Sequence, residues 1–500
     1  MPLHAFAMRT RHLPAALALA CASSLPALTT GPVPTDPIEG VWTGTVTAPQ
    51  GEVAEIGFDF YRNESGGGLT FRLNFPAMFT YGASLGIPVE ITGDGGYAIT
   101  PAFATRLKVE GDRLAGTFGQ AGLPLELKRG GTWTPRPEAP VHPAAPAPLW
   151  RYPLGPGTWA PAVAADGIIY VGGGDGRFHA VRAADGSSLW IWPGSQAIDG
   201  RAALDATTVY FLDTRFNLVA LDRQTGAFRW RLPLHNEFLA GCSAPDNPTF
   251  NHRAATPLVH EGVLYVGSSD GGLYAVNPAT GAVLWRHDAH APVYSGVGLY
   301  GNDTLLFGTM DGAVVLLDRN TQREVLRLTT GGGVVTTPVV AGGRLVAGSR
   351  DYLLYGFDPA GGTPAWKFSY WFSWVESTPA LRDGLLYVGG SDFARVSAID
   401  PATGRAKWST VVHGMSWGTP LVTDRHVFAG TVNQNLPGTL IAHSAGLVKL
   451  DRSTGAIVWR LVLPPAAAGR FAGYAGGPVL AGNKVVVAGL DGFLAAYPVE

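Results

Sequence analysis

Residues Leu273–Trp285 read LYAVNPATGAVLW, and most of the chain is built from copies of this stretch. It begins with an alternating apolar run, bends at Pro-Ala-Thr-Gly and ends in a second run that closes on tryptophan. Alternation predicts a β-strand, and Thr-Gly predicts a tight antiparallel turn whose glycine accepts a positive φ. The other copies, close or loose, lie at His179–Trp190, Val219–Trp230, Val314–Leu326, Tyr355–Trp366, Val396–Trp408 and Val448–Trp459.

The tryptophans set the period of the repeat. With Leu326 standing in for one of them, the gaps from Trp150 to Trp459 are 40, 40, 55, 41, 40, 42 and 51 residues. A period near 40 with four short strands per unit (A to D in chain order, with Asp-Gly between B and C in several units) predicts propeller blades. Eight blades follow from the starts of strand A at Pro161, Ala202, Pro257, Val297, Pro338, Pro379, Pro420 and Pro478.

The last unit, Gly477–Glu500, stops after its third strand. An orphan strand, LWRYPL at Leu149–Leu154, precedes the first unit. We expect it to pair with Phe493–Pro498, because that pairing closes the ring and removes the open edges.

The segments ahead of the ring differ in composition. Residues 1–27 have a basic start and the short apolar run LPAALALACA, which predicts a signal peptide and export to the periplasm or beyond, with a lipid anchor on Cys21 as an alternative. Residues 28–37 form a linker, 38–131 a small β-domain, 132–148 a Pro/Ala-rich linker and 149–500 the propeller.

The β-domain has short alternating strands and Gly-rich turns, which predict a small antiparallel barrel or sandwich. Its Gly40-x-Trp42 start is weakly similar to lipocalin-like barrels. A packing or docking module is favoured over a lipid carrier. The predicted fold class is therefore all-β, an eight-bladed propeller of four-stranded antiparallel blades preceded by this domain.

The repeat resembles the PQQ-like β-propeller superfamily over residues 149–500. That superfamily includes quinoprotein alcohol dehydrogenases, which bind pyrroloquinoline quinone (PQQ) and calcium, and non-catalytic members such as the outer-membrane assembly lipoprotein BamB. The resemblance implies the fold and leaves the function open.

Two expansions interrupt the repeat, at Leu234–His252 between blades two and three and at Val432–Gly446 in the B–C turn of blade seven. In a propeller the D–A connections and the B–C turns lie on one face, so both expansions decorate the same mouth of the channel. The first contains His, Asn, Asp, Glu and Cys242 without a recognisable ligand spacing; a capping loop is favoured over a metal site.

Function is expected where the units differ. Aromatic residues just before strand A should gather at that mouth as a stacking surface for a ligand or peptide, or alternatively fill it as packing. The ligand-binding candidates are Trp159, Trp374, Trp417, Tyr474, Glu376 and His413. The repeated tryptophans that end strand D are expected to pack between blades.

An exported, non-catalytic binding or scaffold protein of the cell envelope is the favoured function, with a protein partner or small ligand at the propeller mouth. It needs no cofactor or metal. The alternative is a dehydrogenase of alcohols or sugars that requires PQQ and calcium. Members of that kind usually show adjacent cysteines over the quinone, whereas Cys242 stands alone here; no nucleophile or haem-attachment motif is present. A net charge of −2 gives no basis for nucleic-acid binding, and a monomer is expected.

Overall fold

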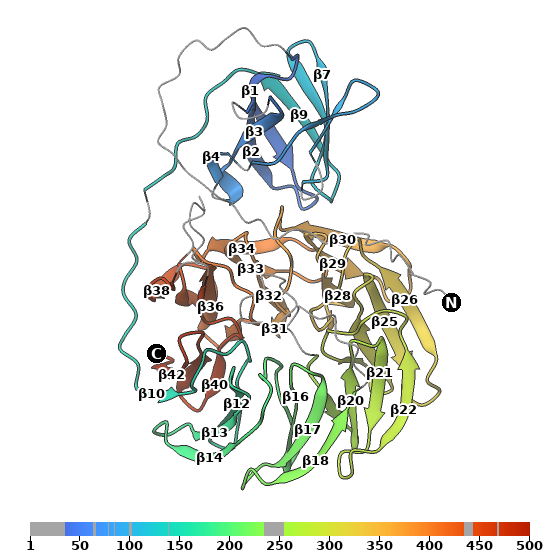
Figure 1. Cartoon of the computed structure of the whole chain (residues 1–500), viewed down its shortest axis with the longest axis vertical. Helices are drawn as coiled ribbons and strands as arrows, with labels where there is room; N and C mark the ends of the chain where they lie inside the picture. The colour runs from blue at the N-terminus through green and yellow to red at the C-terminus, as the bar shows by residue number, and fades with distance from the viewer. Residues whose placement is uncertain are drawn as a thin grey trace, which may run out of the picture.

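The computed structural model describes residues 36–63, 67–78, 80–84, 86–99, 103–138, 140–234, 255–434, 444–467 and 470–500. It shows a curled sheet near the N-terminus and a ring of eight blades (Figure 1). The all-β class and the eight-bladed propeller predicted from the sequence are confirmed. Within these ranges, no helix has the length and apolar character needed to cross a membrane. The predicted signal peptide, Cys21 and Cys242 lie outside them.

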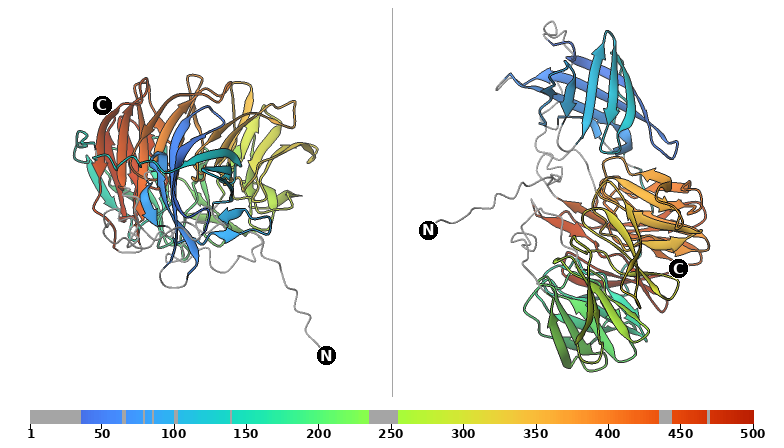
Figure 2. Two further views of the ribbon diagram at one scale, coloured as in Figure 1. Left: turned by 90° about the horizontal axis from the view of Figure 1, so that it is seen from above. Right: turned by 90° about the vertical axis from the view of Figure 1, so that its right-hand side faces the viewer.

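The N-terminal sheet is one curled, antiparallel half-barrel with the order β4-β3-β2-β1-β9-β8-β7-β6-β5. In the described residues its end strands β4 and β5 are not paired with each other, so the predicted small antiparallel β-domain takes the form of an open half-barrel (Figure 2). Its elements are β1 (Gly40–Thr47), β2 (Val53–Arg62), β3 (Leu69–Phe75), η1 (Pro76–Met78), β4 (Thr80–Ser84), β5 (Glu90–Ile91), β6 (Tyr97–Ile99), β7 (Thr105–Glu110), β8 (Arg113–Phe118) and β9 (Leu123–Arg129).

Buried phenylalanines fill the concave side of this half-barrel. Phe58 stacks on Phe60 with ring centroids 5.4 Å apart, and Phe75 meets Phe118 edge to face at 5.5 Å. Each of these four rings is at most 1% exposed. A core packed in this way fits a packing module better than a carrier with an internal cavity.

Every blade runs outward from strand A to strand D. Blades one to four comprise β11 (Val163–Ala165), β12 (Ile168–Gly172), β13 (Phe178–Arg182) and β14 (Ser188–Trp192); β15 (Ala203–Leu204), β16 (Thr208–Leu212), β17 (Asn217–Asp222) and β18 (Phe228–Pro233); β19 (Leu258–His260), β20 (Val263–Gly267), β21 (Gly272–Val276) and β22 (Val283–Asp288); and β23 (Gly298–Tyr300), β24 (Thr304–Gly308), β25 (Ala313–Asp318) and β26 (Glu324–Thr329).

Blades five to seven comprise β27 (Val339–Ala341), β28 (Arg344–Gly348), β29 (Leu353–Phe357) and β30 (Pro364–Ser369); β31 (Ala380–Arg382), β32 (Leu385–Gly389), β33 (Arg395–Ile399) and β34 (Ala406–Val411); and β35 (Leu421–Val422), β36 (His426–Gln434), β37 (Gly446–Asp451) and β38 (Ile457–Val462). A further strand, β39 (Phe471–Gly473), pairs with the end of β36.

Blade eight joins the two ends of the ring. It contains β40 (Val479–Ala481), β41 (Lys484–Ala488), β42 (Phe493–Pro498) and, as its outer strand, β10 (Trp150–Pro153). Trp150 faces Ala496, and Pro153 faces Phe493. The predicted closure of the ring is confirmed.

The repeated tryptophans bind the next blade. In five cases the indole N–H donates to a carbonyl in the C–D turn of the following blade. The pairs are Trp150–Ala183 (3.2 Å), Trp190–Arg223 (3.2 Å), Trp230–Pro278 (2.9 Å), Trp366–Pro401 (2.8 Å) and Trp408–Arg452 (2.9 Å). These contacts support the predicted role in inter-blade packing.

The Thr-Gly part of the motif is shaped by the same contact. Gly404 has a φ of 70°, and a β-carbon there would lie 2.5 Å from the Trp366 ring. The aspartate that begins a turn caps it: Asp222 Oδ1 accepts the N–H groups of Gln224 and Thr225. The C–D turn therefore contacts the tryptophan in two ways. One of its carbonyls accepts the indole N–H, and its glycine, which has no side chain, lets the indole ring lie directly against the backbone.

We expect Gly404→Ala to destabilise the fold more than Gly384→Ala. Gly384 has a similar φ of 76°, but a β-carbon there would have no atom within 4 Å apart from those of its chain neighbours. Alanine at a positive φ should cost about 1–2 kcal/mol at both positions. Contact with the Trp366 ring should add roughly 1–3 kcal/mol at position 404. Denaturant unfolding measures both variants, and equal losses would show that the indole–glycine contact contributes nothing.

A second prediction concerns His179 at the ring seam. Its Nδ1 lies 3.0 Å from the Tyr152 hydroxyl of β10, and burial lowers its pKa to about 4. Since an unfolded histidine titrates near 6.5, the unfolded state binds the extra proton as the pH falls. The stability that depends on neutral His179 is therefore complete above pH 6.5 and is lost toward pH 4, by about 3 kcal/mol.

Unfolding curves between pH 4 and 7 test this effect. His179→Gln should flatten the dependence, whereas His290→Gln, at a side chain that is 75% exposed, should leave it as in the wild type. An unchanged slope in His179→Gln would contradict the assignment.

Candidate functional site

Two adjoining cavities open on the face that carries the D–A connections and B–C turns, here called the D–A face. The central cavity, of about 350 Å³, lies at the channel mouth, and the seam cavity, of about 780 Å³, lies over blade eight. Trp159 and Asp199 line both, so they form the wall between them. This face is the one on which the sequence predicted the binding site.

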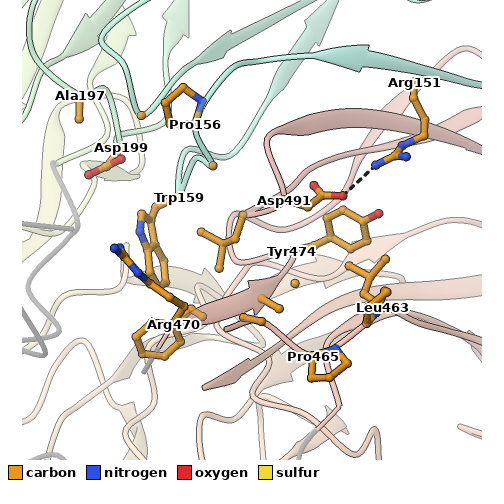
Figure 3. A pocket seen from close by; sticks show the side chains of 18 of the residues that line it. Arg151, Pro156, Trp159, Ala197, Asp199, Leu463, Pro465, Arg470, Tyr474 and Asp491 are labelled. Carbon is orange, nitrogen blue, oxygen red and sulfur yellow. Dashed lines mark hydrogen bonds and ion pairs between the residues drawn. The ribbon is translucent and has the colours of Figure 1, made fainter. Parts of the chain in front are cut away.

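Different elements line the two cavities. The central cavity is bordered by residues at the starts of strand A, including Pro161, Arg201, Thr256, Thr337, Thr378 and Thr419, together with Tyr294, Glu376 and Trp417. The seam cavity is bordered by Pro148, Arg151, Pro156, Leu463, Pro464, Pro465, Arg470, Phe471, Tyr474, Leu490, Asp491 and Tyr497 (Figure 3). Its walls are apolar and aromatic, with a few charged groups, which is the usual make-up of a binding cavity.

Trp159 is half-buried and belongs to an aromatic cluster. Its ring stacks on Trp417 at 5.7 Å and meets Phe471 of β39 edge to face at 5.3 Å. Trp417 is only 4% exposed, and its indole N–H donates to Ser391 Oγ at 2.7 Å. Trp417 therefore packs against one face of the Trp159 ring, and Trp159 lines both cavities.

Asp199 is the ionisable group most changed by its position in this wall. Burial raises the pKa of its carboxyl to about 7, although a hydrogen bond from the Trp159 backbone N–H opposes the shift. The charge of the wall between the cavities therefore changes close to neutral pH.

At the outer end of the seam cavity the charges are paired. Arg151 Nη2 lies 3.0 Å from Asp491 Oδ2, as Figure 3 shows, and its guanidinium lies 3.9 Å from the centre of the Phe493 ring. Below them the hydroxyls of Tyr474 and Tyr497 are 3.3 Å apart, and burial raises the pKa of Tyr474. Tyr474 is 2% exposed, so it forms the floor of the cavity.

Glu376 is held in an ion pair. Its Oε1 lies 2.7 Å from Nη2 and 2.9 Å from Nε of Arg350, and both side chains are at most 10% exposed. The Trp374 ring covers the guanidinium at 4.6 Å. Trp374 thus packs on this pair, and it is not among the residues that line the two cavities.

His413 lies apart from the cavities, beside the linker. Its ring is 5.8 Å from that of His142. Burial, followed by the charge of Arg460, lowers the pKa of His413 to about 4. Of the six candidates, the structure brings Trp159, Trp417 and Glu376 to the central cavity and Trp159 and Tyr474 to the seam cavity.

The sequence did not single out Asp199, Arg151, Asp491 or Arg470. One signal was available: the D–A connection between β38 and β40 spans residues 463–478, whereas that between β34 and β35 spans 412–420. The longer connection carries β39 and one side of the seam cavity. The expansion Leu234–His252 lies outside the described residues apart from Leu234, as does most of Val432–Gly446.

A calcium–quinone site needs several oxygen ligands around the metal. Among the described residues, no group of three or more His, Cys, Asp or Glu side chains is placed to hold a metal ion. Glu376, the acidic candidate at the mouth, is already bonded to Arg350. The described donor set does not fit such a site.

Comparison with known proteins yields two kinds of relative. BamB of Burkholderia pseudomallei (strain K96243) is 24% identical over 348 residues, which are 60% of this chain and 86% of that protein. The quinoprotein alcohol dehydrogenase PedH of Pseudomonas putida is 32% identical over 108 residues, 19% of this chain and 18% of that enzyme. The match to the enzyme is confined to a few repeats.

Solved structures show the same fold. BamB from Moraxella catarrhalis superimposes with a TM-score of 0.53 at 17% identity, covering 70% of this chain and 97% of that one. A family model described as "Outer membrane protein assembly factor BamB" matches residues 191–293, 269–371 and 353–500. Together these segments span most of the ring, and the chain therefore belongs to this family of PQQ-like β-propellers.

Proposed function

We propose that the chain is an exported, non-catalytic scaffold of the cell envelope that holds a protein partner on its D–A face. The observation that carries the proposal is the pair of adjoining cavities around Trp159 and Asp199 on that face. The family supports the same class of function, because the matching model and the relative that matches over 348 residues are both named for outer-membrane protein assembly.

A protein partner suits the chemistry of these cavities. Tryptophan and arginine are the residues that most often dominate protein–protein binding when they lie at the centre of a contact. Trp159 lies between the cavities, with Arg470 drawn beside it in Figure 3. Proline and aliphatic side chains supply the surrounding apolar surface, and the Arg151–Asp491 pair supplies a polar rim.

The location follows from the same proposal. The basic and apolar start of the chain directs export, and the periplasmic side of the outer membrane is where a partner of this kind would be met. Attachment through a lipid on Cys21 is part of the proposal, and mass spectrometry of the exported protein tests it. The protein acts as a monomer.

Site-specific photocrosslinking in the native envelope tests the binding face. A photoreactive amino acid at position 159 should capture a component of the outer-membrane assembly machinery. The control is position 284 on the outer strand β22, where Leu284 is 51% exposed. Absence of a crosslink from position 159, or the same crosslink from both positions, would contradict the proposal.

Replacement of Trp159 by serine should weaken capture of that partner at least about tenfold, since a central tryptophan commonly contributes 2 kcal/mol or more. The melting temperature should fall only slightly, because the ring is half-buried. The matched control is Trp192→Ser, also half-buried but in the outer strand β14, which should bind as the wild type does. Unchanged binding by Trp159→Ser would remove Trp159 from the contact.

The dehydrogenase alternative is tested by incubating the protein with PQQ and Ca²⁺ and following dye reduction with simple alcohols and aldose sugars. We expect no turnover, because Glu376 is committed to Arg350. Turnover that depends on both PQQ and Ca²⁺ would replace the scaffold proposal by the enzymatic one.

A further inference from the structure

The half-barrel and the propeller meet through one loop of the ring. Residues 370–374, YWFSW, follow β30 in the D–A connection between blades five and six; we call them the plug loop. Phe372 enters the phenylalanine cluster of the half-barrel, with ring centroids 4.6 Å from Phe118 and 4.7 Å from Phe103. Trp371 meets Phe75 edge to face at 5.2 Å. One continuous core thus runs from the half-barrel into blades five and six.

The half-barrel is shaped to receive this loop. Gly119 follows β8, and a β-carbon there would lie 3.3 Å from the Phe372 ring. In the turn between β1 and β2, Gln50 bonds the end of β30 twice: its Nε2 donates to the Ser369 carbonyl at 3.1 Å, and its Oε1 accepts the Ser369 N–H at 2.9 Å. The Gln50 side-chain amide thus pairs with the backbone of Ser369 as the backbone of a neighbouring strand would.

The plug loop differs from its counterpart in the preceding blade. The D–A connection after blade four contains Gly331-Gly332-Gly333, whereas the connection after blade five contains Phe372-Ser373-Trp374 just before the matching Val. The ring itself does not require aromatic residues in this connection, because the connection after blade four joins its two blades with glycines instead. The aromatic residues are explained by the half-barrel that covers them.

Two aromatic residues of blade five, Tyr352 and Trp371, occupy left-handed turn positions beside the half-barrel. Tyr352 occupies the B–C turn position held by Gly312 in blade four, at a φ of 73°, and Trp371 has a φ of 57°. Other blades hold non-glycine residues at positive φ in the same two positions, Phe216 and Ala394 in B–C turns and His290 and His413 in D–A connections, so the left-handed conformation belongs to the repeat. It costs a bulky side chain about 1–2 kcal/mol. In blade five both positions carry aromatic side chains. Both contact the docked cluster: Tyr352 lies 6.0 Å from Phe372, and Trp371 packs on Phe75.

The linker keeps the docking within one chain. At its start the Trp133 ring fits against Gly57 and Gly82, and the Thr134 N–H donates to Glu55 at 3.1 Å. Further on, the Arg460 N–H of β38 donates to the Pro143 carbonyl, and the Ala145 N–H donates to the Arg460 carbonyl. The linker is therefore fixed to both bodies along the outside of blade seven (Figure 1).

We propose that the plug loop is a dedicated docking element that completes the core of the half-barrel and fixes it at the rim of the D–A face. The half-barrel then extends that face as part of one rigid body. This inference stands on the contacts between the two bodies and does not depend on what the cavities bind.

Hydrogen exchange and small-angle scattering of the full chain test the proposal. Phe372→Ala should raise amide exchange in β3 and β8 at least about tenfold, equivalent to 1.4 kcal/mol of lost protection. It should also enlarge the radius of gyration, while exchange in blades two and three stays as in the wild type. The control is Phe228→Ala in β18, at a ring that is 55% exposed. Unchanged exchange and scattering in Phe372→Ala would overturn the proposal.

Two further variants test the same docking if Phe372→Ala folds poorly. Gln50→Glu keeps the acceptor for the Ser369 N–H but removes the donor, so it should raise exchange in the same strands by a smaller factor. Trp371→Gly should lower the melting temperature of the wild type but raise it in the Phe372→Ala background, because relief of the left-handed strain then outweighs lost packing. The same sign in both backgrounds would show that the packing of Trp371 does not depend on Phe372, and it would overturn the proposal. A scattering mass that doubles with concentration would overturn it as well, because the docking would then lie between copies.

Discussion

The contact between an outer-strand indole and the next blade's turn is the interaction on which the ring depends. Each such contact needs an indole N–H from one repeat. It also needs a backbone carbonyl and a glycine from the C–D turn of the next repeat. The motif cannot satisfy itself within one blade, so a single unit gains little until its neighbour folds beside it. At the junction of blades seven and eight the C–D turn is missing. There Trp459 packs in a cluster with Tyr497 and with Ala145 of the linker.

The repeat made much of this architecture predictable. The spacing of tryptophans gave the number of blades, and the incomplete last unit gave the strand that closes the ring. Exceptions to the motif were harder to interpret. Trp285 is half-buried, and the turn it would cover has Gln322, at a φ of 60°, in place of glycine. The repeat therefore predicts the inter-blade contact only where one blade has the tryptophan and the next blade has the glycine in its C–D turn.

The site was less predictable because it depends on what covers each side chain. Trp417 and Trp159 occupy equivalent positions before strand A, yet Trp417 is covered by Trp159 and by Phe471, which arrives on β39. The shifted pKa of Asp199 reflects its burial in a wall that Trp159 helps to form. Phe372 packs against Phe118 of β8, a strand that lies more than two hundred residues earlier in the chain. Local patterns place such residues on a face but carry no information about distant neighbours.

The way the ring closes also determines when the seam cavity can form, because residues from both ends of the ring line it. The seam cavity is bordered at one end by Pro148 and Arg151 and at the other by Asp491 and Tyr497. A ribosome therefore makes one wall of the cavity long before the other, and the cavity stays unfinished until β42 pairs with β10. Truncated or stalled chains lack the cavity altogether. The seam cavity therefore exists only in a closed ring, so it distinguishes a chain in which β10 and β42 have paired from one in which they have not.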